Sequence, residues 1–169
     1  SLLFLVPKPT LDWRPVIDLS PLNKFIHQTP FKMETCASVL RAIRKDDWML
    51  SLDLKDTYFQ VPVHPESRRF RRVGSRGIAC QFKVICFGLC TAPQVFTRVM
   101  APVASILHTR GIRMLRYLDD WLILTTSEEG AAWAREETLQ LCQQLGIVIN
   151  LEKSDLIPKQ AAVYLGIPK

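Results

Sequence analysis

The chain has 169 residues, of which 48% are hydrophobic and 22% are charged. This composition excludes an intrinsically disordered chain and is sufficient for one compact domain or a closely packed pair of subdomains. Lysine and arginine number 22 against 16 aspartate and glutamate residues, so the net charge of +6 suits a polyanionic partner without identifying one.

The cysteine content predicts reduced thiols. The five cysteines are an odd number, and no signal-like segment opens the chain, so we expect an intracellular protein, with cytoplasm and nucleus not distinguished. Cys80, Cys86 and Cys90 lie close in sequence, but no second Cys/His pair stands at a zinc-finger spacing, which favours small packing residues. No apolar run approaches about 20 residues, so no membrane contact is expected.

Both ends of the sequence are typical of a fragment. There is no initiator methionine, and the segment Leu2–Val6 is already strand-like. At the other end, Tyr164 begins a new element that stops at Lys169. We therefore expect residues 1–169 to be part of a longer protein.

The first third of the chain predicts a hairpin and a short helix. Leu2–Val6 and Trp13–Leu19 read as strands joined by a proline-rich turn, with Lys8 near its tip. Apolar residues recur at helical spacing over residues 36–43, at Cys36, Val39, Leu40 and Ile43.

Trp48–Leu54 is predicted to be a strand. Because side chains alternate across a strand, Leu50, Leu52 and Leu54 point to one face and Met49, Ser51 and Asp53 to the other. Asp53 is therefore displayed near a strand end, toward whatever cleft lies over the sheet.

The middle of the chain predicts two hairpins and a helix. Val73–Val84 reads as a hairpin, and Thr91–His108 reads as a helix that Pro102 should kink or split. The short apolar runs Ile112–Leu115 and Trp121–Thr125 form the second hairpin, which places Asp119 and Asp120 at its tip.

Glu128–Leu145 predicts a helix that Gly146 ends, followed by a strand at Ile147–Asn150. The expected buried stripe of the helix comprises Ala134, Thr138, Leu141, Cys142 and Leu145. Antiparallel strands interleaved with helices predict an α+β fold, with helices packed on one face of the sheet and the other face available for a ligand.

Asp53, Asp119 and Asp120 are the candidate chemical centre. If their strands are neighbours, the three carboxylates converge, and divalent cations such as Mg²⁺ would relieve their repulsion and bind substrate phosphates. Two such metals would stabilise the attacking and leaving oxygens of an in-line phosphoryl transfer. Taken singly, however, an Asp-Asp pair at a turn or an Asp in a strand is usually solvated surface.

Three motifs favour the metal-site interpretation over solvated surface. They are Ser51–Tyr58, Phe87–Gln94 and Tyr117–Asp120, and they occur in this order. Together with Trp13–Asp18 and Tyr164–Gly166, they make the chain resemble the reverse transcriptase family over essentially its whole length. The resemblance implies the fingers and palm of an RNA-directed DNA polymerase, with thumb and RNase H segments absent. Its implied partners are an RNA or DNA template with primer and deoxynucleoside triphosphates, and it leaves the oligomeric state open.

The resemblance also implies roles for single residues. The metal ligands, for Mg²⁺ or Mn²⁺, would be the three aspartates and the backbone of Leu54. Lys8 and Arg14 would contact the triphosphate, unless they belong to a solvated hairpin. Lys153 would protonate the pyrophosphate, with a solvated loop lysine as the alternative.

The nucleotide pocket implied by the resemblance comprises Asp56, Thr57, Tyr58, Phe87 and Gly88. The backbone N–H groups from Asp56 to Tyr58 would contact the triphosphate and the 3′-hydroxyl. The Tyr58 ring would exclude a 2′-hydroxyl and so select deoxynucleotides, with an aromatic core residue as the alternative. Phe87 and Gly88 would line the pocket.

Further features are less direct. Tyr164–Gly166 resembles the start of the hairpin that grips the primer, and the basic cluster Arg68–Arg72 suits either a template backbone or a solvated surface. Many retrotransposon enzymes carry phenylalanine at the position of Phe87, where retroviral enzymes usually carry glutamine. Three segments together resemble the enzymes of DIRS-type retrotransposons, which integrate by a tyrosine recombinase. These segments are Trp48–Asp56, Phe87–Phe96 and Arg116–Trp121.

Two other functions would use parts of the same sequence pattern. A catalytically inactive, nucleic-acid-binding remnant of a retroelement would keep the fold, but all three aspartates are present. A two-metal nuclease or phosphatase would need further carboxylate or histidine ligands, and His27, His64 and His108 lie outside the motifs.

Overall fold

The computed structural model describes residues 3–7, 13–32, 38, 41–75, 77–160, 163–164 and 167–168. The chain divides into two compact units: unit 1 is Ser1–Phe31 with Tyr58–Phe96, and unit 2 is Lys32–Thr57 with Thr97–Lys169. Within the described ranges, no helix combines the length and the apolar character needed to cross a membrane.

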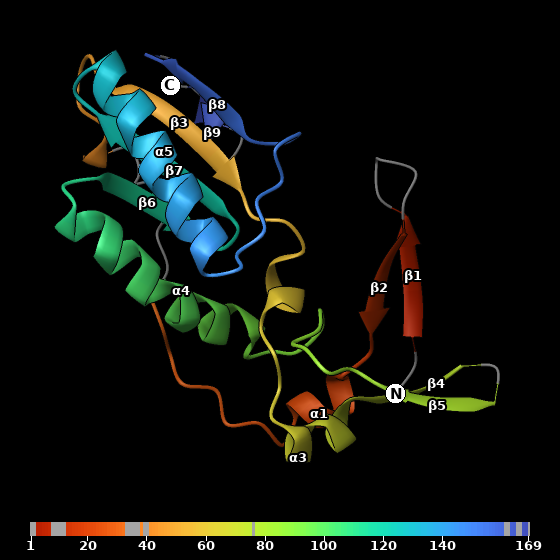
Figure 1. Cartoon of the computed structure of the whole chain (residues 1–169). Helices are drawn as coiled ribbons and strands as arrows, with labels where there is room; N and C mark the ends of the chain where they lie inside the picture. The colour runs from red at the N-terminus through yellow and green to blue at the C-terminus, as the bar shows by residue number, and fades with distance from the viewer. Residues whose placement is uncertain are drawn as a thin grey trace. The chain divides into compact units, whose positions relative to one another are not determined.

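Unit 1 contains two antiparallel hairpins, as the sequence predicts (Figure 1). In the first, β1 (Leu3–Pro7) pairs with β2 (Trp13–Ile17). In the second, β4 (Arg72–Ser75) pairs with β5 (Ile78–Gln81). The connection between β1 and β2, including Lys8, lies outside the described residues. The short helices are α1 (Ser20–Asn23), η1 (Thr57–Gln60), α3 (Pro65–Arg68) and η2 (Arg69–Arg71).

Unit 2 is built on a four-stranded antiparallel sheet with the strand order β6-β7-β3-β8. The predicted strand at Trp48–Leu54 and the predicted hairpin around Asp119 are therefore confirmed, and they are neighbours in the sheet. The strands are β3 (Trp48–Asp53), β6 (Arg113–Tyr117), β7 (Asp120–Thr125) and β8 (Asp155–Lys159).

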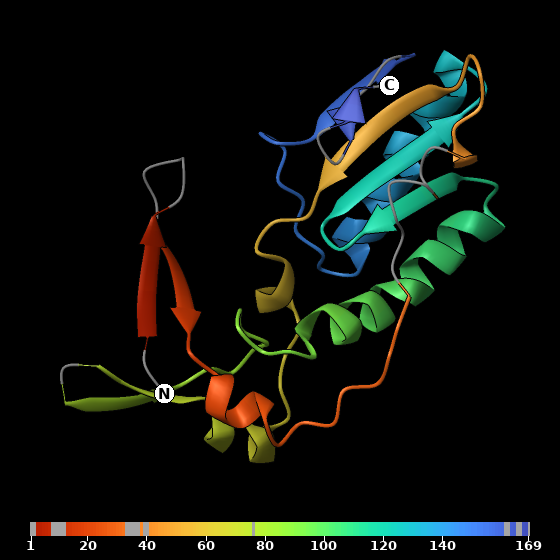
Figure 2. The same ribbon diagram turned by 180° about the vertical axis from the view of Figure 1, so that it is seen from behind.

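Both faces of this sheet carry buried residues. Leu50, Leu52 and Leu54 are each 1% exposed and share one face. On the opposite face, Met49 is 3% exposed and packs in a buried cluster with Leu122 and Leu124, so the prediction that this face is free for a ligand is wrong at Met49. Helix α5 (Glu128–Gln144) contacts β3, β7 and β8 and lies across one face in Figure 1. Figure 2 shows the sheet from the side that α5 leaves uncovered. Ser51 and Asp53 alternate with the leucines and share the face of Met49, and both are partly exposed.

Local chemistry fixes both ends of α5. The Ser127 hydroxyl accepts a hydrogen bond from the Gly130 N–H (3.0 Å), which caps the first turn. Gly146 follows the C-terminal end with φ of 71°, a conformation that glycine adopts without strain. The predicted buried stripe is confirmed except at Leu145, which is 51% exposed because it stands at the C-cap, past the last helical turn.

Helix α4 (Ala92–Thr109) confirms the predicted helix at Thr91–His108 but runs unbroken through Pro102. Pro102 lies on the exposed side, where its ring meets solvent and the loss of one backbone hydrogen bond leaves the helix continuous. The helix predicted over residues 36–43 falls largely on residues outside the described part, although Ser38, Arg41 and Ala42 are helical.

The predicted strand at Ile147–Asn150 is wrong. This segment makes only an isolated bridge between Ile149 and Leu54, and the fourth strand of the sheet is β8. Pro158 within β8 weakens the strand signal in the sequence, since proline is tolerated only in edge strands, which is the place β8 occupies. Near the C-terminus, β9 (Val163–Tyr164) pairs with β10 (Ile167–Pro168).

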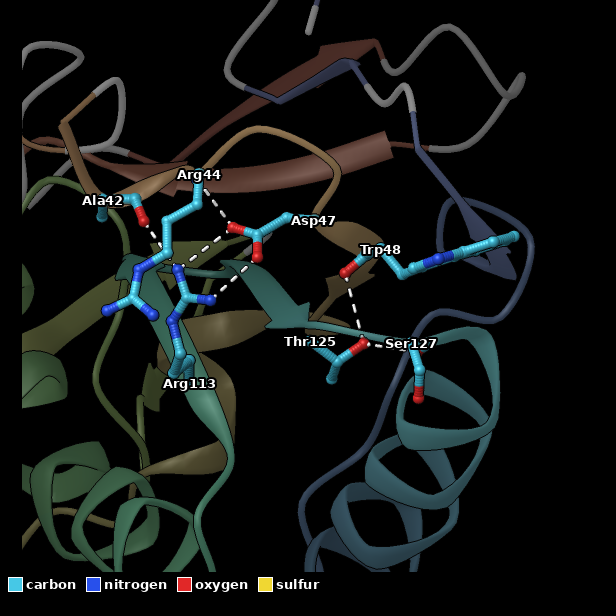
Figure 3. Close-up of polar contacts among 7 residues, drawn as sticks. All are labelled: Ala42, Arg44, Asp47, Trp48, Arg113, Thr125 and Ser127. Carbon is cyan, nitrogen blue, oxygen red and sulfur yellow. Dashed lines mark hydrogen bonds and ion pairs between the residues drawn. The ribbon is translucent and has the colours of Figure 1, made fainter.

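An ion pair ties the segment before β3 to β6. The guanidinium of Arg113 donates to both carboxylate oxygens of Asp47 (2.9 and 3.1 Å) and to the carbonyl of Ala42 (2.8 Å), as Figure 3 shows. The backbone N–H of Arg44 donates to Asp47 as well (2.7 Å). Burial alone would raise the pKa of Asp47, but these hydrogen bonds outweigh it and hold the pKa below its usual value.

Candidate active site

The sheet of unit 2 brings two of the three candidate carboxylates face to face. Asp53 ends β3 and Asp120 begins β7, and the two residues are direct partners in the antiparallel register. Cross-strand partners project to the same face with Cβ atoms about 4.5–5.5 Å apart. Asp120 therefore lies in the sheet rather than in the turn, while Asp119 occupies the turn as predicted.

The β6–β7 turn is held against the end of β3. Leu118 adopts a φ of 54°, which lets the chain reverse within two residues. The carbonyl of Asp119 then accepts a hydrogen bond from the Leu54 N–H (2.9 Å), and the Trp121 indole donates to the carbonyl of Leu118 (3.3 Å). These bonds fix the backbone that carries all three aspartates.

The carboxylates are near enough to perturb one another. Burial, followed by the charges of Asp119 and Asp53, raises the pKa of Asp120 to about 6, partly offset by Lys153. Burial also raises the pKa of Asp53, opposed by a hydrogen bond from the Asn150 side chain and the charge of Lys153, while Asp119 adds to the rise. The site thus concentrates negative charge that a bound cation would neutralise.

The donor set fits hard divalent cations. Carboxylate oxygens are the ligands that Mg²⁺ prefers, and mutual repulsion between adjacent carboxylates is what such a cation relieves. Among the residues that the structure describes, no group of three or more Asp, Glu, His or Cys side chains is already gathered as a metal site. The observed feature is the facing pair of Asp53 and Asp120, with Asp119 in the adjoining turn.

Residues just after β3 adopt a compact turn. Leu54 is 1% exposed, and its carbonyl accepts a long hydrogen bond from the Thr57 hydroxyl (3.5 Å). Asp56 adopts a φ of 50°, and its side chain is exposed. The predicted contacts of Leu54, Asp56 and Thr57 with metal or triphosphate are not tested by these positions and stay predictions.

In unit 1, the rings of Tyr58 and Phe87 lie together. Their centroids are 5.0 Å apart, and Phe96 packs edge-on against Tyr58 at 5.9 Å. Tyr58 is 9% exposed. Two residues predicted for the nucleotide pocket are therefore neighbours, but the burial of Tyr58 is also what the alternative of a core aromatic requires.

Gly88 occupies a position that admits no side chain. Its φ is 97°, and a Cβ atom there would lie 2.4 Å from the carbonyl oxygen of Ile17. Asn23 fastens the same loop, since its amide donates to the Gly88 carbonyl (2.8 Å) and accepts from the Cys90 N–H (3.0 Å). Asn23 was not predicted to take part, because a contact across 65 residues leaves no local pattern.

Of the three basic residues predicted to act at the site, only Lys153 has a described side chain. Lys8 and the side chain of Arg14 lie outside the described part of the chain, although the backbone of Arg14 pairs with Val6 in the first hairpin. Lys153 is exposed, and its charge acts on Asp53 and Asp120. Lys153 thus lies within electrostatic reach of the carboxylates.

Asn150 and Ser154 also contact Asp53, although neither was predicted as a site residue. The side chain of Asn150 donates to the Asp53 carboxylate, and the hydroxyl of Ser154 accepts from the Asp53 N–H (3.0 Å). Both flank Lys153, so the motif around that lysine was the available signal.

Comparison with known proteins identifies the family of the chain. Residues 6–168 match the reverse transcriptase (RNA-dependent DNA polymerase) family, and the chain belongs to that family. It is 28% identical to the enzymatic polyprotein of Cestrum yellow leaf curling virus over 91% of this chain. The chain spans 24% of the length of that polyprotein.

Solved structures confirm the predicted fold of fingers and palm. The native prototype foamy virus protease-reverse transcriptase is similar with a TM-score of 0.84 and 27% identity, covering 99% of this chain and 22% of that one. A foamy viral protease-reverse transcriptase in complex with an RNA/DNA hybrid gives a TM-score of 0.82 at 22% identity, covering 98% of this chain and 22% of that one. The second likeness bears on the fold alone.

Proposed function

We propose that this chain is the catalytic core of an RNA-directed DNA polymerase that extends a primer with deoxynucleotides. The observation that carries the proposal is the pairing of Asp53 with Asp120 across β3 and β7, with Asp119 in the adjoining turn. Membership of the reverse transcriptase family supports it, and so does the raised pKa of Asp120, which marks a cluster of like charges.

Divalent metal ions, Mg²⁺ or Mn²⁺, would be held by the three aspartates and the Leu54 carbonyl, and they would supply electrostatic stabilisation to the transferring phosphoryl group. The protein itself orients these ligands through the sheet register and the hydrogen bond from Leu54 to Asp119. Lys153 is proposed to donate a proton to the leaving pyrophosphate.

The substrates proposed are deoxynucleoside triphosphates and a primer paired to an RNA or DNA template. Membership of the reverse transcriptase family supports this choice of partner. Lys8 and Arg14 are proposed to bind the triphosphate, assisted by the backbone from Asp56 to Tyr58. Phe87 and Gly88 are proposed to line the pocket.

Tyr58 is proposed to exclude the ribose 2′-hydroxyl. Replacing it with valine would open that space, so we expect the preference for deoxynucleotides over ribonucleotides to fall by at least tenfold. The test compares single-nucleotide insertion kinetics for the two sugar types. A Tyr58→Val protein that folds normally and keeps its full preference would assign Tyr58 to the core alone.

The polymerase proposal is tested by primer extension on an RNA template with Mg²⁺ or Mn²⁺, using the complete polypeptide that carries this chain. The Asp119→Asn, Asp120→Asn double variant should lose extension by several orders of magnitude. Asp46→Asn is the matched control, because it makes the same chemical change at an exposed turn where φ is 66°. Primer-template binding without extension by the unmodified protein would favour a non-catalytic remnant.

We also propose an origin in a DIRS-type retrotransposon, with the protein acting inside the cell. The sequence of Arg116–Trp121 and the phenylalanine at position 87 support this origin. The neighbouring reading frames of the element test it, since a tyrosine recombinase is expected there and a retroviral type of integrase would contradict it.

A further inference from the structure

The chain that leaves α5 docks on the end of β3 without forming a strand. The carbonyl of Val148 accepts from the Lys55 N–H (2.9 Å), and Ile149 bridges Leu54. One residue later, the Asn150 N–H donates to the Asp53 carbonyl (2.8 Å). The segment therefore follows β3 as far as the aspartate and no farther.

From Asn150 onward the chain closes into a tight turn around one carbonyl group. The carbonyl of Asn150 accepts from the Lys153 N–H (3.2 Å), the Ser154 N–H (3.0 Å) and the Ser154 hydroxyl (2.7 Å). Because the Ser154 hydroxyl donates its single proton to the Asn150 carbonyl, it can only accept a hydrogen bond from Asp53. It takes the hydrogen bond of the Asp53 N–H at 3.0 Å.

The turn thus forms three hydrogen bonds with Asp53. Its N–H is bound by Ser154, its carbonyl by the backbone of Asn150, and its carboxylate by the side chain of Asn150. The amide of Asn150 donates to the carboxylate, which occupies one acceptor position and leaves the others for a cation. A hydrogen bond of this kind orients a ligand and restricts its rotation.

We infer that Asn150 is a positioning residue, which orients the Asp53 carboxylate for metal binding while Ser154 holds the turn that carries it. This inference rests on the proposed function, because it assumes that Asp53 is a metal ligand. The inference adds to the proposed metal ligands a residue, Asn150, that orients the carboxylate of one of them.

The test measures Mn²⁺ binding by electron paramagnetic resonance, alongside thermal unfolding, on the complete polypeptide. Asn150→Leu keeps the backbone N–H and the approximate volume but removes the amide donor. Loss of such a supporting hydrogen bond typically weakens metal binding by about 10- to 100-fold. We therefore expect the apparent Kd for Mn²⁺ to rise at least tenfold, with primer extension recovering as Mn²⁺ is raised.

Two further variants separate positioning from simple packing. Asn150→Gln retains an amide donor and should stay within about threefold of the unmodified affinity, whereas a purely structural role predicts that its extra methylene is as harmful as leucine. Gln143→Leu is the matched control, since it removes an amide from an exposed position on α5. If the leucine variant shows no cooperative unfolding, Asn150→Ala takes its place.

The outcomes also distinguish this inference from the proposed function. If the unmodified protein extends primers and binds Mn²⁺, and Asn150→Leu binds Mn²⁺ with unchanged affinity, the positioning role is overturned and the polymerase stands. If Asn150→Leu loses affinity and Asn150→Gln loses it equally, the role is again overturned. An unmodified protein that neither binds Mn²⁺ nor extends primers would remove the proposed function, and this inference with it.

Discussion

Replacing Asp120 with asparagine is expected to stabilise the metal-free protein while abolishing metal-dependent synthesis. The pKa of Asp120 rises from 3.8 to about 6, because burial and the charges of Asp119 and Asp53 disfavour its ionised form. At about 1.4 kcal/mol per pKa unit, this shift corresponds to about 3 kcal/mol of destabilisation at neutral pH. The side chain is partly exposed, and solvent screening reduces the expected gain for Asp120→Asn to about 1–2 kcal/mol.

The sign of the pH dependence follows from the direction of the shift. A carboxyl whose pKa is raised by folding favours the folded state when it is protonated, and this contribution is fully present below its unfolded value of 3.8. It is lost as the pH rises through about 6. The unmodified protein should therefore gain stability as the pH falls from neutral, and the advantage of Asp120→Asn should shrink to about half at pH 5.

Thermal unfolding in the presence of a chelator measures this difference. For a chain of 169 residues, a gain of 1–2 kcal/mol raises Tm by about 4 °C. Glu152→Gln, an exposed neighbour of the site, should leave Tm nearly unchanged. An Asp120→Asn protein that is less stable than the unmodified one at neutral pH, or equally favoured at both pH values, would refute the argument from carboxylate repulsion.

Three other substitutions test the framework around the site, each by chemical denaturation. Gly88→Ala should cost about 2 kcal/mol or more, because its Cβ would lie 2.4 Å from a backbone oxygen at a φ of 97°, while Gly74→Ala, with open space around it, should stay within about 0.5 kcal/mol. Arg113→Met should cost about 2–3 kcal/mol at neutral pH by leaving the carboxylate of Asp47 buried without its ion pair. Since the pKa of Asp47 is lowered, that loss should shrink as the pH falls through its folded pKa. Ser127→Ala should cost about 1 kcal/mol by removing the N-cap of α5.

The elements that the sequence predicted are those with a local signal. Alternation along β3 predicted that Leu50, Leu52 and Leu54 share one buried face, but it did not predict that Met49 is buried on the other face, because that burial depends on packing with Leu122 and Leu124. The hairpin of β6 and β7 was also predictable from a local signal, since two apolar runs flank a short polar turn. Proximity in sequence also made the placement of Asp119 accurate to the residue.

The parts that were missed depend on distant contacts. Ser154 meets Asp53 across 101 residues, and nothing in the sequence around either residue indicates the other. The segment Ile147–Asn150 has the β-branched, apolar composition of a strand, but the turn centred on the Asn150 carbonyl ends its pairing with β3. The edge strand of the sheet is instead β8, and Pro158 within it weakens the strand signal in the sequence.

The physical conflict at the end of β3 argues for function over structure. The backbone N–H of Asp53 is hydrogen-bonded to Ser154 and its carbonyl to the Asn150 N–H, so both polar backbone groups of this residue are held in place. The same fold then pairs it with Asp120, whose carboxylate it repels. A position selected for stability alone would not combine a rigid backbone with facing like charges, because asparagine in place of one aspartate would remove the repulsion. Such local conflicts are expected where a ligand completes the site, and a divalent cation is the ligand that we propose for these groups.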